Sequence, residues 1–156
     1  MDALRISILE KKLEEENALL LIKLHPTEKL KKFKTQSPNI EFMSSDADIY
    51  ACLEEVDVII TDYSSVFYDF LFLKNDKFIM FPFDYDEYIK NSRDLIDDYY
   101  SNVSRNVAQT LDELFEFMFT SKNLDDSKHL NELKNKFWYQ ASIGCDHIFQ
   151  KIQEKI

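Results

Sequence analysis

Residues 56–65 constrain the fold most, because a short apolar run ends there in hydroxyl and carboxylate side chains. Residues 58–60 are continuously apolar, which predicts a strand covered on both faces. From Val66 onward apolar residues recur mainly at spacings of three and four, which predicts a helix that begins near Ser64. The free N–H groups at such a helix start favour an anion over the strand end. The sequence therefore predicts an α/β protein with a phosphate site at this point.

Composition limits the class of protein. A chain of 156 residues with 45% hydrophobic content can bury one sizeable core, which predicts a single domain spanning residues 1–156. The formal net charge of −10 argues against general nucleic-acid binding. Cys52 and Cys145 form no CxxC pair, so no disulfide framework or zinc site is indicated. The longest apolar stretch, residues 18–24, is too short to span a bilayer, and we expect a cytoplasmic protein.

The chain contains a single glycine, Gly144. The dinucleotide-binding fingerprint and the P-loop both need several glycines for close backbone approach to phosphates. Both classes are therefore excluded. A phosphate bound here would have to be held by side-chain hydroxyls and a helix N-terminus.

Helical and extended patterns alternate along the first half, which is typical of a parallel sheet with crossover helices. We expect helices over residues 4–17, 27–34 (one short turn), 46–55 with Asp46 as its cap, and 65–73. We expect strands over residues 19–24, 39–43, 56–61 and 78–83.

The second half is more helical. Thr110 and Glu113 form a capping box that predicts a helix start, and residues 130–139 and 146–156 predict two further helices. Residues 84–98 are acidic without the spacing of a calcium loop, which favours a solvated loop over a metal site. For Tyr99 and Tyr100 we expect packing in the core or between domains. We therefore expect a helical C-terminus and no bound metal or cofactor.

Two strand ends carry chemistry: His25, followed by Pro26, and the TDYSS box over residues 61–65. In an open parallel sheet both would lie at the carboxyl edge, where ligands bind. Ordinary structural roles are open for the same residues. His25 can bond to backbone at a strand end, whereas the serines and Asp62 can cap a helix. Asp69 can be a solvated residue on its helix.

The order of these features resembles the CDP-glycerol glycerophosphotransferase family, whose members polymerise teichoic acids and related capsular polymers. The resemblance rests on the HP dipeptide after an apolar strand, the box TDYSSVFYDF over residues 61–70, and the DYDEY segment over residues 84–88. It implies a Rossmann-like parallel sheet with flanking helices, forming the C-terminal, donor-binding half of a GT-B glycosyltransferase-like fold. The implied activity is transfer of glycerol phosphate or ribitol phosphate from a CDP-alditol.

Carried over residue by residue, the resemblance assigns a site to six positions. His25 would be catalytic, and Ser64, Ser65 and Asp69 would contact the donor. Thr61 and Asp62 would shape the turn. The hydroxyls and helix N-terminus suit phosphate oxygens, and a histidine can supply a proton or positive charge to a leaving phosphate.

The family's catalytic unit also has a preceding domain for the acceptor. The resemblance therefore implies that this chain is part of a two-domain transferase and is inactive alone. The implied acceptor is a lipid-linked polymer, which would place the enzyme peripherally on the inner face of the membrane. This acidic chain has no basic amphipathic helix for such attachment.

Two alternatives remain open at the level of sequence. Bacterial sialyltransferase-like enzymes also pair an HP motif with a serine motif around a cytidine nucleotide, although the aspartate and tyrosine of TDYSS favour a CDP-alditol. The domain could also be non-catalytic and serve to dock to the rest of a synthase.

Overall fold

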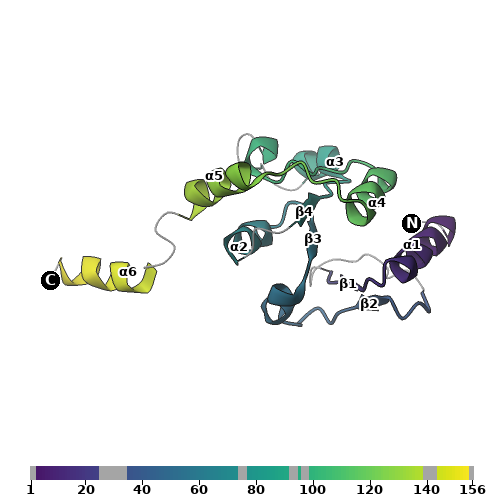
Figure 1. The fold of residues 1–156 in the computed structure, drawn as a ribbon. Helices are drawn as coiled ribbons and strands as arrows, with labels where there is room; N and C mark the ends of the chain where they lie inside the picture. Colours follow the sequence, from purple (N-terminus) through teal and green to yellow (C-terminus); the bar gives the residue numbers. More distant parts are fainter. Residues whose placement is uncertain are drawn as a thin grey trace.

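The computed structural model describes residues 3–24, 35–73, 77–91, 95, 99–138 and 144–154. Figure 1 shows short strands surrounded by helices, with the N-terminal helix beside the first two strands. The helices are α1 (Ala3–Glu15), the 3₁₀ helix η1 (Ile49–Glu55), α2 (Val66–Leu73), α3 (Tyr85–Asn91), the 3₁₀ helix η2 (Tyr99–Asn102), α4 (Leu111–Phe119), α5 (Ser127–Phe137) and α6 (Gly144–Gln153). The strands are β1 (Leu20–Ile22), β2 (Ile40–Phe42), β3 (Val58–Thr61) and β4 (Lys77–Met80).

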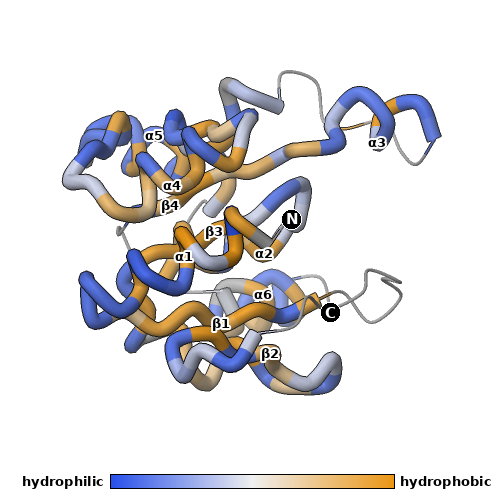
Figure 2. The backbone as a smooth tube through the Cα atoms, turned by 90° about the vertical axis from the view of Figure 1, so that its right-hand side faces the viewer, coloured by the Kyte–Doolittle hydropathy of each residue, from blue (hydrophilic) through white to orange (hydrophobic). Residues whose placement is uncertain are grey.

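Strands β3 and β4 pair in parallel at the centre of the core, with Ile59 opposite Phe78. Successive side chains of a strand point to opposite faces. Phe78 and Met80 accordingly pack in one cluster with α2 and α5, whereas Ile79 packs in another with α4. All three are buried. In β3, Ile59 packs in the first cluster, whereas Val58 and Ile60 pack against the second. The expected coverage of residues 58–60 on both faces is thus confirmed, and Figure 2 shows apolar colouring along both strands.

The expected single parallel sheet is not formed by the described residues. Instead β1 pairs in parallel with β2, and β3 pairs in parallel with β4, as two separate sheets. Phe115 and Met118 of α4 pack against the cores of both sheets. A helix, rather than a shared ladder of hydrogen bonds, therefore connects the two. The α/β class and the parallel pairing hold, whereas the continuous sheet was a wrong prediction.

Several element boundaries also differ from expectation. Asp48, not Asp46, caps the segment after β2, because its side chain accepts from the Tyr50 N–H, and that segment is the 3₁₀ helix η1. Helix α5 begins three residues early because Asp126 accepts from the His129 N–H. The expected helical turn over residues 27–34 lies outside the described residues.

Helix α6 lies apart from the other described elements (Figure 1). Its apolar residues Ile148, Phe149 and Ile152 are exposed. In the part of the chain that the structure describes, no helix has the length and apolar character needed to cross a bilayer.

The predicted capping box is present at the start of α4. The Thr110 hydroxyl accepts from the Glu113 N–H, and the Glu113 carboxylate accepts from the Thr110 N–H. Hydrogen bonds from the backbone of Gln109 and Thr110 lower the pKa of Glu113. This contribution to stability is therefore full above the ordinary pKa of glutamate and is lost as the pH falls through the lowered value.

Replacing Thr110 by alanine tests that cap. We expect Thr110→Ala to lower the free energy of unfolding by about 1 kcal/mol, because one backbone N–H of the first turn loses its acceptor. Urea denaturation measures the change. Thr110→Ser keeps a hydroxyl and should remain close to the unsubstituted chain; equal losses in the two variants would contradict the cap's role.

Candidate functional site

The TDYSS box lies where sequence analysis places it, between a strand and a helix. Thr61 is the last residue of β3, and its carbonyl accepts from the Phe81 N–H at 2.8 Å. Residues 62–65 form a turn that leads into α2. This turn therefore occupies the carboxyl edge of the β3–β4 pair, the edge at which α/β proteins bind ligands.

Two side chains of the turn accept hydrogen bonds from backbone N–H groups at or just before the start of α2. The Asp62 carboxylate accepts from the Ser64 N–H at 3.2 Å, and the Ser64 hydroxyl accepts from the Val66 N–H at 3.4 Å. The Ser64 carbonyl also accepts from the Phe67 N–H. The capping role considered for Ser64 is therefore confirmed, whereas Asp62 holds the turn just before the helix.

Ser65 differs from Ser64. Its side chain is exposed, and within the described part of the chain neither its N–H nor its hydroxyl makes a hydrogen bond. A backbone N–H and a hydroxyl at a helix start are both donors suited to an anion. Ser65 thus supplies the two donors that the capping interactions leave accessible.

Asp69 lies one helical turn beyond Ser65, so the two residues share a side of α2. Its carboxylate accepts from the Tyr50 hydroxyl of η1 at 2.7 Å. That hydrogen bond, together with partial desolvation and the negative charge, raises the pKa of Tyr50. Asp69 is half-buried and held in place, rather than freely solvated. Tyr50 and Asp69 are 19 residues apart, and no sequence pattern pairs them.

A cluster of five tyrosines adjoins the turn: Tyr63, Tyr85, Tyr88, Tyr99 and Tyr100. Tyr63 stacks on Tyr88 with ring centroids 4.1 Å apart, and its hydroxyl donates to Asp84 at 2.9 Å. The Tyr99 hydroxyl donates to the Asp62 carbonyl at 3.0 Å. Sequence analysis treated residues 84–98 as a solvated loop, whereas the described part of that stretch contains α3 and contacts the turn. The packing expected of Tyr99 in the core is confirmed. We refer to these residues as the tyrosine cluster.

Burial is the main cause that raises the pKa of both Tyr63 and Tyr99. For Tyr63 the hydrogen bond to Asp84 acts in the same direction, and for Tyr99 the next cause is the charge of Asp62. Both phenols therefore keep their protons at neutral pH and remain hydrogen-bond donors.

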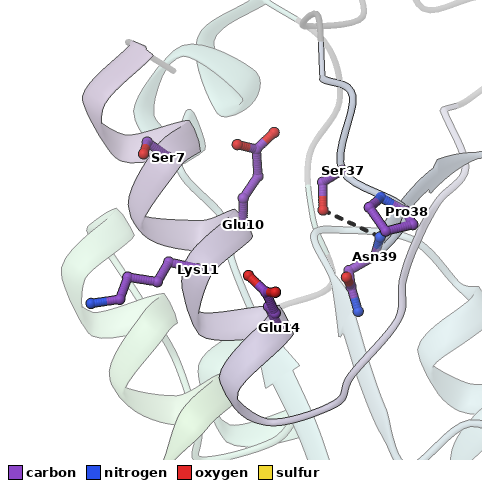
Figure 3. Close-up of a pocket in the computed structure, with 7 residues that line it drawn as sticks. All are labelled: Ser7, Glu10, Lys11, Glu14, Ser37, Pro38 and Asn39. Carbon is purple, nitrogen blue, oxygen red and sulfur yellow. Dashed lines mark hydrogen bonds between the residues drawn. The ribbon is translucent and has the colours of Figure 1, made fainter.

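A shallow groove of about 330 Å³ lies elsewhere, along α1 and the turn before β2. Figure 3 shows Glu10 and Glu14 of α1 on the side of Ser37 and Asn39, whereas the Lys11 side chain extends away from them. Asn39 immediately precedes β2, so the groove lies at the amino end of that strand, and no residue of the TDYSS turn lines it. It is therefore not the predicted ligand site.

A serine, an aspartate and a histidine also lie together in a buried polar network away from the turn. The Ser104 hydroxyl donates to Asp125 at 2.5 Å, and His129 lies 3.6 Å from the same carboxylate. Ser104 therefore contacts the aspartate rather than the histidine, and it is completely buried. This arrangement cannot activate a serine nucleophile and instead joins α5 to β4 through the Phe78 carbonyl. The sequence analysis assigned no role to His129.

His25 lies outside the described residues, so its position relative to the turn stays a prediction. The structure does bring Thr61, Asp62, Ser64, Ser65 and Asp69 together along β3, the turn and α2. Among the described residues no three His, Cys, Asp or Glu side chains are grouped so that they could hold a metal ion.

The fold and the turn define an α/β protein with a hydroxyl-bearing strand-to-helix turn of the kind that suits phosphate groups. The model of the family described as CDP-Glycerol:Poly(glycerophosphate) glycerophosphotransferase matches residues 3–142. The chain belongs to that family.

Similar proteins are polymerases of teichoic acid. The chain is 32% identical over 112 residues to the teichoic acid poly(ribitol-phosphate) polymerase of Bacillus spizizenii, a match that covers 67% of this chain and 17% of the relative. It is 28% identical over 141 residues to the teichoic acid ribitol-phosphate polymerases TarL and TarK of Staphylococcus aureus, covering 89% of this chain and 25% and 27% of the relatives. The chain thus spans roughly a fifth to a quarter of the length of these relatives.

Proposed function

We propose that this chain binds a CDP-alditol and forms the donor side of a transferase that builds a poly(alditol phosphate) teichoic acid. The alditol we propose is ribitol, because the relatives described above are named as ribitol-phosphate polymerases. The family match over most of the chain supports a transferase of this type.

The observation that carries the proposal is the position of Ser65. Its hydroxyl and N–H are accessible at the start of α2, directly beyond the end of β3. A helix N-terminus stabilises a nearby anion by about 0.3–1 kcal/mol, and charge-assisted hydrogen bonds from a hydroxyl add to this. We therefore place the pyrophosphate of the donor over Ser65, with Ser64 and Asp62 fixing the turn and Asp69 lining the same side of α2.

The proposed reaction is a direct displacement at the phosphorus that carries the alditol. A hydroxyl oxygen of the acceptor forms a new P–O bond, the P–O bond to CMP breaks, and CMP leaves with that electron pair. The proton of the acceptor hydroxyl passes to solvent. We assign to His25 the proton or positive charge that stabilises the departing phosphate, a role that suits an imidazole near neutral pH.

The acceptor side belongs, in this proposal, to a further domain of a two-domain GT-B-like enzyme. That domain would receive the lipid-linked polymer and would hold the enzyme against the inner face of the membrane. This division follows from the family resemblance, and it predicts binding of the donor, without turnover, by this chain alone.

A calorimetric titration of the 156-residue chain with CDP-ribitol, CDP-glycerol, CMP-sialic acid and CDP tests the proposal. We expect saturable binding of CDP-ribitol that Ser65→Ala and His25→Ala each weaken by about ten- to hundredfold, the usual cost of a hydrogen bond to a charged group. Ser121→Ala, at an exposed serine beyond α4, is the matched control and should bind like the unsubstituted chain.

Other outcomes would redirect the assignment. Tighter binding of CMP-sialic acid than of either CDP-alditol would favour the sialyltransferase-like alternative. A folded chain that binds none of the four nucleotides would contradict the donor site and would leave docking to a synthase as the leading function.

A further inference from the structure

The TDYSS turn is exposed to solvent, yet contacts with neighbouring residues restrain its conformation. Asp62, Ser64 and Ser65 are exposed. The side chains of the turn make two hydrogen bonds to nearby backbone: Asp62 accepts from the Ser64 N–H, and Ser64 accepts from the Val66 N–H. Short polar turns of this kind have few contacts of their own to hold one conformation. Two phenols of the tyrosine cluster supply the missing contacts.

The first contact is made by a residue of the turn itself. The side chain of Tyr63 leaves the exposed turn and packs half-buried between the rings of the cluster, with Tyr88 stacked at 4.1 Å and an interplanar angle of 20°. Its hydroxyl donates to Asp84 at 2.9 Å. Because Tyr63 immediately precedes Ser64, fixing its side chain limits the backbone freedom of the neighbouring serine.

The second contact is made to the backbone of the turn. Tyr99 is 8% exposed, and its hydroxyl donates to the Asp62 carbonyl at 3.0 Å. This hydrogen bond fixes the peptide plane that joins Asp62 to Tyr63. The peptide next to the turn is held as well, since the Thr61 carbonyl accepts from the Phe81 N–H.

We propose that Tyr63 and Tyr99 are positioning residues of the donor site: their hydroxyls fix the turn so that the two donors of Ser65 face one phosphate. The inference rests on the proposed function for the identity of the ligand. It assigns no contact with the donor to either phenol. The two phenols would preorganise the site: the turn is ordered when the protein folds, so binding does not lose further conformational entropy in ordering it.

The cluster itself provides matched controls. Tyr85 and Tyr88 share the ring contacts of Tyr63, yet within the described residues neither of their hydroxyls makes a hydrogen bond. Tyr→Phe at each of the four positions removes the same atom and keeps the ring. A general effect of polarity or packing on affinity would be similar in all four variants. An effect on the position of the turn would appear only in Tyr63→Phe and Tyr99→Phe, whose hydroxyls make the hydrogen bonds.

We expect Tyr63→Phe and Tyr99→Phe each to weaken binding of CDP by about three- to tenfold, the range of one ordinary hydrogen bond. Tyr85→Phe and Tyr88→Phe should leave the affinity unchanged. Asp84→Asn keeps an acceptor for Tyr63 and should retain affinity, whereas Asp84→Ala should match Tyr63→Phe. The double variant of Tyr63→Phe with Asp84→Ala should lose no more than either single variant.

A second readout needs no ligand. In ¹H–¹⁵N spectra of the unliganded chain, the amide shifts of Ser64 and Ser65 should move in Tyr63→Phe and Tyr99→Phe, and much less in the two control variants. Amide shifts and affinities that change equally in all four variants, or in none, would overturn the proposal. If the unsubstituted chain does not bind CDP, the proposed function fails, and the amide shifts alone decide whether the two phenols position the turn.

Discussion

Leu71→Ala is expected to lower the free energy of unfolding by about 2–5 kcal/mol, the range found when a buried leucine loses its side chain and leaves a cavity. Leu71 is completely buried in α2, in the cluster that also contains Phe67 and Phe78. Because α2 carries the TDYSS turn at its start, the same substitution should weaken any ligand binding at that turn. Urea denaturation followed by circular dichroism measures the loss.

Leu73→Ala is the matched control for this prediction. Leu73 lies two residues further along the same helix and is 50% exposed. Its replacement by alanine should change the free energy of unfolding by no more than about 0.5–1 kcal/mol. Equal effects at the two positions would show that the assigned buried face of α2 is wrong.

Asp125→Ala should have an effect of similar size for a different reason. The Asp125 carboxylate accepts from the Ser104 hydroxyl, the Arg105 N–H and the Asn106 amide, at 2.5, 2.8 and 3.2 Å. Ser104 and Asn106 are completely buried and keep the Phe78 carbonyl as an acceptor, whereas the Arg105 N–H loses its partner. Arg105 is exposed, so its N–H can bond to water instead. Hydrogen bonds to a carboxylate contribute about 1.5–3 kcal/mol each, and because Asp125 is buried and accepts several of them we expect a total loss of about 3 kcal/mol.

Asp126→Ala separates this network from the neighbouring helix cap. Asp126 is exposed, and its carboxylate accepts from the His129 N–H at the start of α5. Its replacement should shift the midpoint of urea denaturation clearly less than Asp125→Ala does. A larger shift for Asp126→Ala would mean that the cap, rather than the buried network, joins α5 to β4.

The local elements were predictable where the pattern and the chemistry agreed. The apolar run of β3, the helix after Ser65 and the capping box at Thr110 were each recognisable in the sequence, because strand burial, helical periodicity and side-chain caps are local signals. The TDYSS box could therefore be placed at a strand end. The five predicted site residues that the structure describes lie along one strand, one turn and one helix.

The long-range contacts were not predictable in the same way. Tyr50 and Asp69 are 19 residues apart, and Tyr99 and Asp62 are 37 apart, so no periodicity relates them. The separation of the strands into two sheets depends on how Phe115 and Met118 of α4 pack, which is a tertiary outcome. Asp48, rather than Asp46, caps η1, and the Asp46 carboxylate instead accepts from the Ser44 hydroxyl.

The contacts of the TDYSS turn also have a consequence for the order in which the site can form during synthesis. Tyr63 needs Asp84, which lies 21 residues downstream, and Asp62 needs Tyr99, which lies 37 residues downstream. As a nascent chain leaves the ribosome, the serines emerge before either anchor. We therefore expect the turn to acquire its final geometry only after η2 has been translated, so that the proposed donor site would be completed late in the maturation of this domain.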